Sequence, residues 1–526
     1  MGIPSYFSYI VKNHNNILIK LHQLNKNIDN LYLDSNSIIY DSMRLLEFNG
    51  SNYKYENKLI NIICNKIKEY IINVQPSNRV IIAFDGVAPL AKLEQQRIRR
   101  YKSMIEQKIF NSNNTTWNKR AITPGTQFMI KLNNEVQKFF SPNMCISLGL
   151  NEIIVSGSNI PGEGEHKLFE YIRNNNNSHK FQTTLIYGLD ADLIMLALNH
   201  LPISKNIYLY RETPDFIKYI DRSLNPNESY ILNIPEMAKA IISTMNNGKP
   251  VNNKQQTNRL YDYIFICFLL GNDFLPHFPS VNIRTNGIHI LLNAYKNTIG
   301  KSNNNLTDGN KIFWNHFYKF INVLSKNEYD NLKNEYIIRN KMEKRSFTES
   351  NERYLNIPIK NRTIERYINP YDSGWENRYY ESLFNINNNN NHFVKKICIN
   401  YLEGLEWVMK YYTTNCSDWR WCYHYNYPPL FKDLIKYIPK WDVDMIEPNT
   451  NKSIHPYVQL AYVLPQESLN LLPKHIYREL MFKKNHYYNN NSKFIWAFCK
   501  YIWESHVELP TIDIDELEHF IHNIKN

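Results

Sequence analysis

The sequence predicts an α/β fold in which a mostly parallel, doubly wound sheet carries helices on both faces, with a helical, aromatic-rich region added to it. Two patterns support this prediction. Short β-branched runs alternate with helical patterns over roughly the first 290 residues, as expected for parallel strands joined by helices. The later residues are rich in aromatic side chains, and their helices need a packing surface of their own. At 526 residues and 43% hydrophobic composition, the chain is long enough for two or three cores.

The predicted strands are apolar, β-branched runs that stop close to a polar residue. In chain order they are Leu31–Asp34, Arg79–Asp85, Glu152–Ser156, Thr184–Gly188 and Ile207–Tyr210. Helical patterns separate the strands, which favours parallel pairing within one sheet.

Four segments follow from changes in composition along the chain. Residues 1–300 contain the strands and form the core domain, and residues 301–362 are rich in Asn, Lys and Glu and predict a helical or partly flexible connector. The aromatic-rich region covers residues 363–480 and includes a predicted helix at Phe393–Tyr412. Residues 481–526 predict a C-terminal helical segment, because WAFCKYIW has the pattern of a helical packing surface.

The net charge indicates the kind of binding partner, and the cysteine content indicates the cellular compartment. The net charge of +12 and the pI near 9.0 favour a polyanion, because a basic groove gains affinity by releasing counterions from phosphates. The seven cysteines include no C-x-x-C pair, so we expect neither a disulfide nor a zinc site. The start lacks a signal-peptide pattern, and apolar runs such as Ile264–Leu270 are too short to cross a bilayer. We therefore expect a monomeric, cytoplasmic protein without a membrane partner, with the nucleus or a viral factory as alternatives.

Carboxylates stand at or near the ends of most predicted strands. They are Asp34, Asp85, Glu163, Glu165, Asp190, Asp192 and Asp273. Because the carboxyl ends of parallel strands meet at one edge of a doubly wound sheet, we expect these acids to converge there. Asp192 also precedes the helical run LIMLAL, so it could serve as the N-cap of that helix.

A convergent set of acids predicts bound cations. Several carboxylates in one cleft repel one another unless cations neutralise them. Oxygen ligands without His or Cys favour magnesium or manganese. Two such ions about 4 Å apart would stabilise the attacking water and the leaving oxygen when a phosphodiester is hydrolysed. The sequence therefore predicts two Mg²⁺ or Mn²⁺ ions and no covalent nucleophile.

A basic helix follows Asp85 directly. Pro89 suits the first turn of a helix, and the residues after it are good helix formers. One face of this helix, at spacing i, i+4, i+7 and i+8, carries Lys92, Gln96, Arg99 and Arg100. Three cations and an amide on one face predict a pocket for a terminal phosphate, because guanidinium groups can bind its oxygens in pairs.

These stretches together resemble the Xrn/Rat family of 5′→3′ exoribonucleases. The first block of matching motifs is MGIPSYF, LYLDSNSIIY, FDGVAPLAKLEQQRIRRYKS, ITPGTQFM, SGSNIPGEGEHKLFEYIR, YGLDADLIML and FLLGNDFLPHFPSVNI. A second block is GWENRYYESLF, YLEGLEWVMKYY, DWRWCYHYNYPPL and QLAYVLPQESLNLLP. The two blocks cover most of residues 1–480. The resemblance implies a core of the PIN/flap-nuclease type with an added second conserved region.

The resemblance also implies roles for individual residues. The seven acids named above would be catalytic metal ligands, and Lys92, Gln96, Arg99 and Arg100 would bind a 5′-phosphate. In the family, a His and a Trp stack on the 5′ bases. Tyr40 stands at the His position, and either Trp419 or Trp421 could supply the Trp. The expected activity is degradation of single-stranded RNA with a 5′-monophosphate to mononucleotides.

Two features depart from the family pattern. The segment between Tyr101 and Ile122 is short, which predicts a truncated form of the helix that projects beside the site. The chain ends soon after the second block, so we expect the large C-terminal extensions of cellular relatives to be absent or replaced.

Two alternative functions remain open at this stage. A flap-type DNA nuclease would use a similar acid cluster, but GNDFLPHFPSVNIRTNG lacks the glycine pattern of its helical hairpin. A catalytically silent RNA-binding scaffold is expected to lose acids, and none of the seven is lost.

Overall fold

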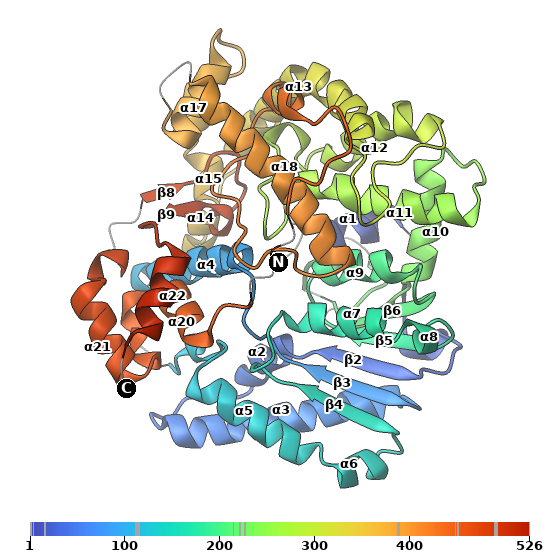
Figure 1. The fold of residues 1–526 in the computed structure, drawn as a ribbon, viewed down its shortest axis with the longest axis vertical. Coiled ribbons are helices and arrows are strands. Elements are labelled where there is room, and N and C mark those ends of the chain that lie inside the picture. The colour runs from blue at the N-terminus through green and yellow to red at the C-terminus, as the bar shows by residue number, and fades with distance from the viewer. Residues whose placement is uncertain are drawn as a thin grey trace.

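The structure, a computed structural model, is shown in Figure 1. It describes residues 3, 5–14, 17–110, 116–213, 215–219, 222–225, 228–386, 390–447, 449, 452–488 and 493–524. The shortened segment between Tyr101 and Ile122 therefore lies partly outside the described residues.

A seven-stranded sheet forms the centre of the first half of the chain, in the order β1-β7-β6-β5-β2-β3-β4. The strands from β2 to β6 pair in parallel, and β7 pairs antiparallel with both β6 and β1. Their bounds are β1 (Leu18–Ile19), β2 (Asn30–Asp34), β3 (Arg79–Ala83), β4 (Glu152–Ser156), β5 (Thr183–Tyr187), β6 (Asn206–Glu212) and β7 (Ser229–Leu232). All five predicted strands are confirmed, whereas the two antiparallel strands were not predicted.

Helices cover both faces of the sheet, as Figure 1 shows. Below the sheet in that view lie α3 (Asn52–Val74), α5 (Gln127–Phe139) and α6 (Pro142–Ser147), and α2 (Asn36–Met43) lies at the left end of the sheet in contact with α3. On the other side lie α1 (Tyr6–Asn13), α7 (Gly164–Asn174), α8 (Asn176–His179), α9 (Asp192–His200) and α10 (Ile234–Met245). The alternation of β2 explains the two layers: Leu31 and Leu33 face the α3 side, and Tyr32 faces the α7 side. The predicted doubly wound α/β class is confirmed.

The remaining helices lie above the sheet in Figure 1, except the last three, which lie to its left beside the C-terminus. They are α4 (Leu90–Ile109), α11 (Asn253–Cys267), α12 (Gly287–Asn297), α13 (Trp314–Glu343), α14 (Ser350–Leu355), α15 (Ile357–Lys360), α16 (Thr363–Ile368), α17 (Trp375–Phe384), α18 (Asn391–Thr413), α19 (Phe431–Leu434), α20 (Pro456–Val463), α21 (Lys474–Lys483) and α22 (Ile514–His522). A hairpin of β8 (Lys493–Ile495) and β9 (His506–Glu508) packs near α4.

The region predicted as a connector is mostly helical. Its long helix α13 buries an apolar stripe that includes Trp314, Phe317, Ile321 and Leu324. This stripe packs into the same core as the helices of the aromatic-rich region. No helix within the described ranges combines the length and apolar character needed to cross a membrane.

Candidate active site

The predicted acids gather where the parallel strands end. Asp34 is the last residue of β2, and Asp85 lies two residues after β3. Gly164, the first residue of α7, approaches both acids so closely that a Cβ there would lie 2.7 Å from Asp34 Oδ1 and 3.4 Å from Asp85 Oδ1. A larger residue at this point would have to displace the Asp34 carboxylate, whereas its contact with Asp85 would be an ordinary one.

Two neighbours orient the Asp85 carboxylate. The backbone N–H of Gly164 donates to Asp85 Oδ1 at 2.7 Å, and the side-chain amide of Asn36 donates to Oδ2. Asn36 Oδ1 in turn accepts from the backbone N–H of Asp85 at 3.2 Å. The start of α7 and the start of α2 thus hold one acid in a fixed direction.

Lys92 lies inside the acid cluster. Its Nζ forms an ion pair with Glu163 and donates to Asp273 Oδ2 at 2.7 Å. All three side chains are nearly buried, with 11%, 6% and 4% of their surface exposed. Burial disfavours the Lys92 ammonium, but the two carboxylates outweigh it and raise the lysine pKa well above its usual value. The predicted phosphate ligand therefore contacts two predicted metal ligands in this structure.

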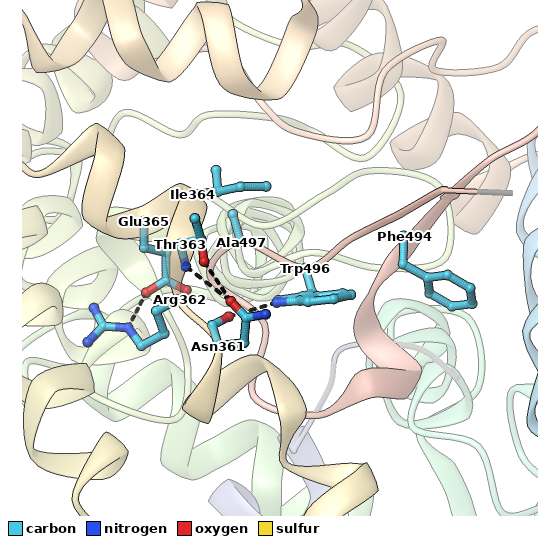
Figure 2. A pocket seen from close by; sticks show the side chains of 8 residues that line it. All are labelled: Asn361, Arg362, Thr363, Ile364, Glu365, Phe494, Trp496 and Ala497. Carbon is cyan, nitrogen blue, oxygen red and sulfur yellow. Dashed lines mark hydrogen bonds and ion pairs between the residues drawn. The ribbon is translucent and has the colours of Figure 1, made fainter. Parts of the chain in front are cut away.

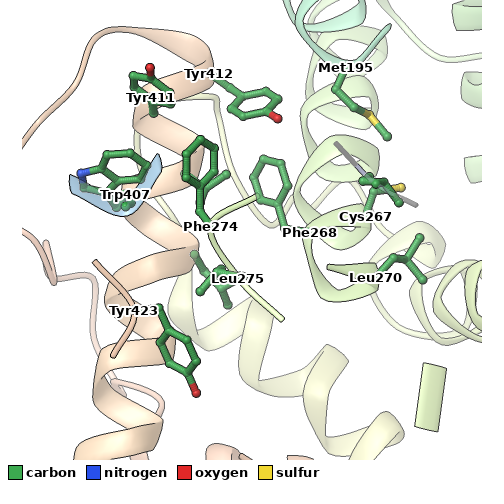
Figure 3. Close-up of a cluster of buried hydrophobic side chains, with 14 of the residues drawn as sticks. Met195, Cys267, Phe268, Leu270, Phe274, Leu275, Trp407, Tyr411, Tyr412 and Tyr423 are labelled. Carbon is green, nitrogen blue, oxygen red and sulfur yellow. The ribbon is translucent and has the colours of Figure 1, made fainter. Parts of the chain in front are cut away.

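Two tyrosines from α18 complete the contacts to the acids. The hydroxyl of Tyr411 donates to Glu163 Oε1 at 2.9 Å, and the hydroxyl of Tyr412 donates to Asp192 Oδ1 at 2.9 Å. Figure 3 shows both rings at the same end of α18. The N-cap of α9 is Ala191, so Asp192 is not that cap and lies in the first turn. Reasoning from the sequence missed both tyrosines.

Burial and mutual repulsion disfavour the charged forms of several acids. The pKa of Asp34 is raised well above its usual value by burial and by the nearby Asp85 and Asp190. The pKa of Glu165 is also raised well above its usual value, first by burial and then by the charges of Asp192 and Glu163. Burial and Asp273 raise the pKa of Asp192 to about 7. For these three acids, burial and like charge outweigh the neutralisation by nearby cations.

The donor set fits hard divalent cations. Asp34 Oδ1 and Glu165 Oε2 are buried and have no hydrogen-bond partner among the described residues. Oxygen ligands left open in this way, surrounded by like charge, are what Mg²⁺ or Mn²⁺ requires. Within the described part of the chain, no three His, Cys, Asp or Glu side chains are already arranged as a metal site. The acids share one region, and a cation would have to draw their oxygens together.

The basic face of α4 presents groups without anionic partners. Gln96 Oε1 and Arg100 Nε are buried and lack hydrogen-bond partners within the described residues, and Arg99 is exposed. Burial lowers the pKa of Arg100 to about 10; its neighbour Tyr40 opposes this shift, while Arg99 and Arg120 add to it. No carboxylate is among these neighbours, so an added anion would relieve the repulsion. The sequence did not predict Arg120 as part of this group.

The two candidate tryptophans differ in burial. Trp421 is 7% exposed and its ring stacks on Trp407, with 5.1 Å between ring centroids. Trp419 is partly exposed, and its carbonyl accepts from the backbone N–H of Leu90 at 3.0 Å, at the start of α4. Tyr40, on α2, is 42% exposed. Trp421 therefore belongs to the core, and Trp419 lies beside the basic helix.

A pocket of about 120 Å³ lies elsewhere, between the start of α16 and the chain around β8 (Figure 2). Its polar groups are largely paired with one another. Trp496 Nε1 donates to the Asn361 carbonyl at 2.8 Å, and the Thr363 hydroxyl donates to Asn361 Oδ1 at 2.7 Å. The pocket shares no lining residue with the acid cluster, so we regard it as a gap between packed segments and not as part of the active site.

Two family models match the chain in order. Residues 1–213 match the model described as XRN 5'-3' exonuclease N-terminus. Residues 254–366 and 360–526 match the Xrn1 helical domain. The first match covers Asp34, Asp85 and Asp192, and the second covers α18.

Curated relatives show the same similarity. The 5'-3' exoribonuclease 1 of Saccharomyces cerevisiae is 26% identical over 92% of this chain and 40% of its own length. The human 5'-3' exoribonuclease 1 is 27% identical over 100% of this chain and 34% of its own length. The 5'-3' exoribonuclease 2 of Arabidopsis thaliana is 24% identical over 98% and 66%, respectively. The chain thus spans between 34% and 66% of the length of these relatives. Because both models match in sequence order over most of its residues, the chain belongs to the Xrn family of 5′→3′ exonucleases.

Proposed function

We propose that this protein is a 5′→3′ exoribonuclease that degrades single-stranded RNA carrying a 5′-monophosphate and releases mononucleotides. The observation that carries this proposal is the position of a buried acid cluster beside Arg99 and Arg100 of α4, for which the described residues show no ion pair. Lys92 of α4 contacts the acids, the neighbours of Arg100 described above include no carboxylate, and Arg99 of the same helix is exposed. The names of the relatives, which are 5'-3' exoribonucleases, support the same activity.

The acids are proposed to hold two divalent ions, Mg²⁺ or Mn²⁺. When bound, such ions would neutralise the carboxylates and stabilise the charge that develops on the phosphodiester oxygens. The open oxygens of Asp34 and Glu165 are the first candidates for ligands, together with Asp192. The Asp85 carboxylate is already oriented by its hydrogen bond from Gly164, so it would have to move little to bind an ion. Asp190 is exposed at the mouth of the cluster, where it can approach an ion without loss of packing.

The helix α4 is proposed to determine which phosphodiester bond is hydrolysed. Gln96, Arg99 and Arg100 would bind the terminal phosphate, and Lys92 lies at the acids one to two turns earlier. At about 1.5 Å of rise per residue, Lys92 and Arg99 are separated by roughly 10 Å along the helix axis. With the terminal phosphate bound at Arg99 and Arg100, the rigid helix would place the first phosphodiester bond of the RNA, and not an internal one, at the acids. This geometry supports release of single nucleotides.

The activity is tested with RNA labelled at its 5′-phosphate and incubated with Mg²⁺. We expect mononucleotides as the first products, no intermediate cut from the 3′ end, and no reaction when EDTA removes the metal. Activity that persists in EDTA, or products that shorten from the 3′ end, would contradict the proposal.

Tyr40 and Trp419 are proposed to stack on the 5′ bases. Both side chains are partly exposed and both lie next to α4 groups, Tyr40 near Arg100 and Trp419 at Leu90. We expect Trp419→Ala to slow turnover on poly(A) and poly(U) alike, because a stacked base contributes about 1–3 kcal/mol regardless of its identity. Single-turnover rates on both polymers measure this effect.

Trp421→Phe is the matched control. It keeps an aromatic ring in the core contact with Trp407, so its main effect should be on stability, with a loss of roughly 1–3 kcal/mol in the free energy of unfolding. If Trp419→Ala stays folded and turns over like wild type, while Trp421→Phe slows turnover on both polymers, the assignment of the stacking residue is wrong.

A further inference from the structure

The end of α18 places two adjacent tyrosines on two different acids. Successive residues of an α-helix are separated by about 100° around the axis, so Tyr411 and Tyr412 point in different directions. Tyr411 reaches Glu163 before α7, and Tyr412 reaches Asp192 in the first turn of α9, both at 2.9 Å. One helix of the aromatic-rich region thus contacts acids from two separate crossovers of the sheet domain.

Both rings are held by packing on several sides. The ring of Tyr411 stacks on His166 with 3.8 Å between centroids and on Trp407 with 4.9 Å. The ring of Tyr412 meets Phe268 edge-on at 5.4 Å. The Tyr412 carbonyl also accepts from the side-chain amide of Asn199, within α9, at 2.8 Å. Figure 3 shows Trp407, Tyr411 and Tyr412 on α18 beside Phe268. Neither hydroxyl can leave its acid without moving a packed ring.

Among the described residues, the contact from Tyr412 leaves the second oxygen of Asp192 available, whereas Glu163 is held at both oxygens. Glu163 accepts from Tyr411 at Oε1 and pairs with Lys92 at Oε2, so its plane is fixed at both oxygens. Asp192 accepts from Tyr412 at Oδ1. For Asp192, a donor bonded to one oxygen orients the carboxylate for a cation at the other; for Glu163, the donor fixes the plane in which its remaining lone pairs lie.

We propose that Tyr411 and Tyr412 are positioning residues through which the aromatic-rich region orients Glu163 and Asp192 for metal binding. This inference rests on the proposed metal-dependent nuclease function. If the inference holds, the aromatic-rich region contributes to metal binding in the active site as well as to the stability of the fold. Neither tyrosine touches the substrate in this proposal, because each acts through the acid that it contacts.

The test compares three Tyr→Phe variants, each of which removes a single hydroxyl. Tyr411→Phe and Tyr412→Phe remove the donors to the acids. Tyr401→Phe is the control: Tyr401 is buried on the same helix and donates to the Pro276 carbonyl at 3.1 Å, which is not a carboxylate. Mn²⁺ binding is measured by calorimetry on each protein without RNA, and the apparent Mg²⁺ affinity, kcat and KM are measured with RNA. Thermal unfolding gives the stability of each variant.

We expect Tyr411→Phe and Tyr412→Phe to weaken metal affinity about 10–100-fold, as loss of a residue that orients a metal ligand commonly does. KM for RNA should change less than about threefold, and the fall in Tm should match that of Tyr401→Phe. Saturating metal should restore most of kcat. In the Tyr412→Phe/Asp192→Asn double variant, metal affinity should be no weaker than in Asp192→Asn alone, because both changes act on one ligand.

The inference is overturned if the Tyr411→Phe and Tyr412→Phe variants bind Mn²⁺ like Tyr401→Phe, or if the double variant shows additive losses. Calorimetry separates this outcome from failure of the proposed function. A wild-type protein that binds Mn²⁺ but does not degrade RNA contradicts the function and leaves the comparison of metal affinities valid.

Discussion

Asp192→Asn and Glu165→Gln are each expected to slow RNA hydrolysis by more than about a hundredfold, while RNA binding stays measurable. Each change keeps the shape of the side chain and removes one negative ligand from the acid cluster. Charge stabilisation by bound metal contributes several kcal/mol to such a reaction, and about 1.4 kcal/mol corresponds to a factor of ten. Single-turnover hydrolysis at saturating protein, together with filter binding of RNA, separates the two effects.

The same helix offers a control for Glu165. Glu170 also lies on α7, but its side chain is exposed and faces away from the buried acids. Glu170→Gln should keep the wild-type rate. Glu165→Gln should not lower the Tm of the metal-free protein, because burial and like charge disfavour the carboxylate that it replaces. Rates within threefold of wild type for both Asp192→Asn and Glu165→Gln would contradict the assignment of the metal site.

The Arg99→Ala/Arg100→Ala double variant is expected to lose the preference for a 5′-phosphate. Wild-type protein should degrade 5′-monophosphate RNA at least about tenfold faster than 5′-hydroxyl RNA, since leaving one partner of a buried charged contact unpaired costs about 2–5 kcal/mol. The double variant should lose activity mainly on the phosphorylated substrate. The ratio of kcat/KM for the two substrates, measured for both proteins, gives the result.

Lys108→Ala controls for loss of charge on α4. Lys108 lies in the last turn of this helix and pairs with Glu467 at the surface. Its substitution should leave the ratio of kcat/KM unchanged. An unchanged ratio in the Arg99→Ala/Arg100→Ala variant would show that the terminal phosphate binds elsewhere.

The parallel strands and the acids could be predicted from the sequence because both follow local rules. β-branched runs such as Arg79–Ala83 form strands, and residues after parallel strands meet at one edge. The antiparallel strands could not be predicted in the same way. Strand β1 has only two residues, Leu18 and Ile19, and it becomes a strand through pairing with Ile231 and Leu232 of β7.

The contacts between the sheet domain and the aromatic-rich region could not be predicted from the sequence for a different reason. Tyr411 and Tyr412 look like ordinary apolar residues of a helix, and only the docking of α18 on the sheet domain brings their hydroxyls to the acids. Packing against Trp407 of α18 buries Trp421, whereas Trp419 stays partly exposed, although the two residues stand two positions apart in one motif. Spacing on α4 indicated one face for Lys92 and Arg99, but not that the Lys92 ammonium would pair with Glu163.

The central claim, exonucleolytic degradation from a 5′-monophosphate, is tested most directly by comparing RNAs that differ only at the 5′ end. Wild-type protein with Mg²⁺ is incubated with one unstructured RNA as the 5′-monophosphate, the 5′-hydroxyl, the 5′-triphosphate and a closed circle. We expect the monophosphate to be degraded at least about tenfold faster than the other linear forms, because only it fits the cations of α4 without leaving them unpaired or clashing. The circle should remain intact. Cleavage of the circle, or equal rates on all linear substrates, would contradict the proposed function.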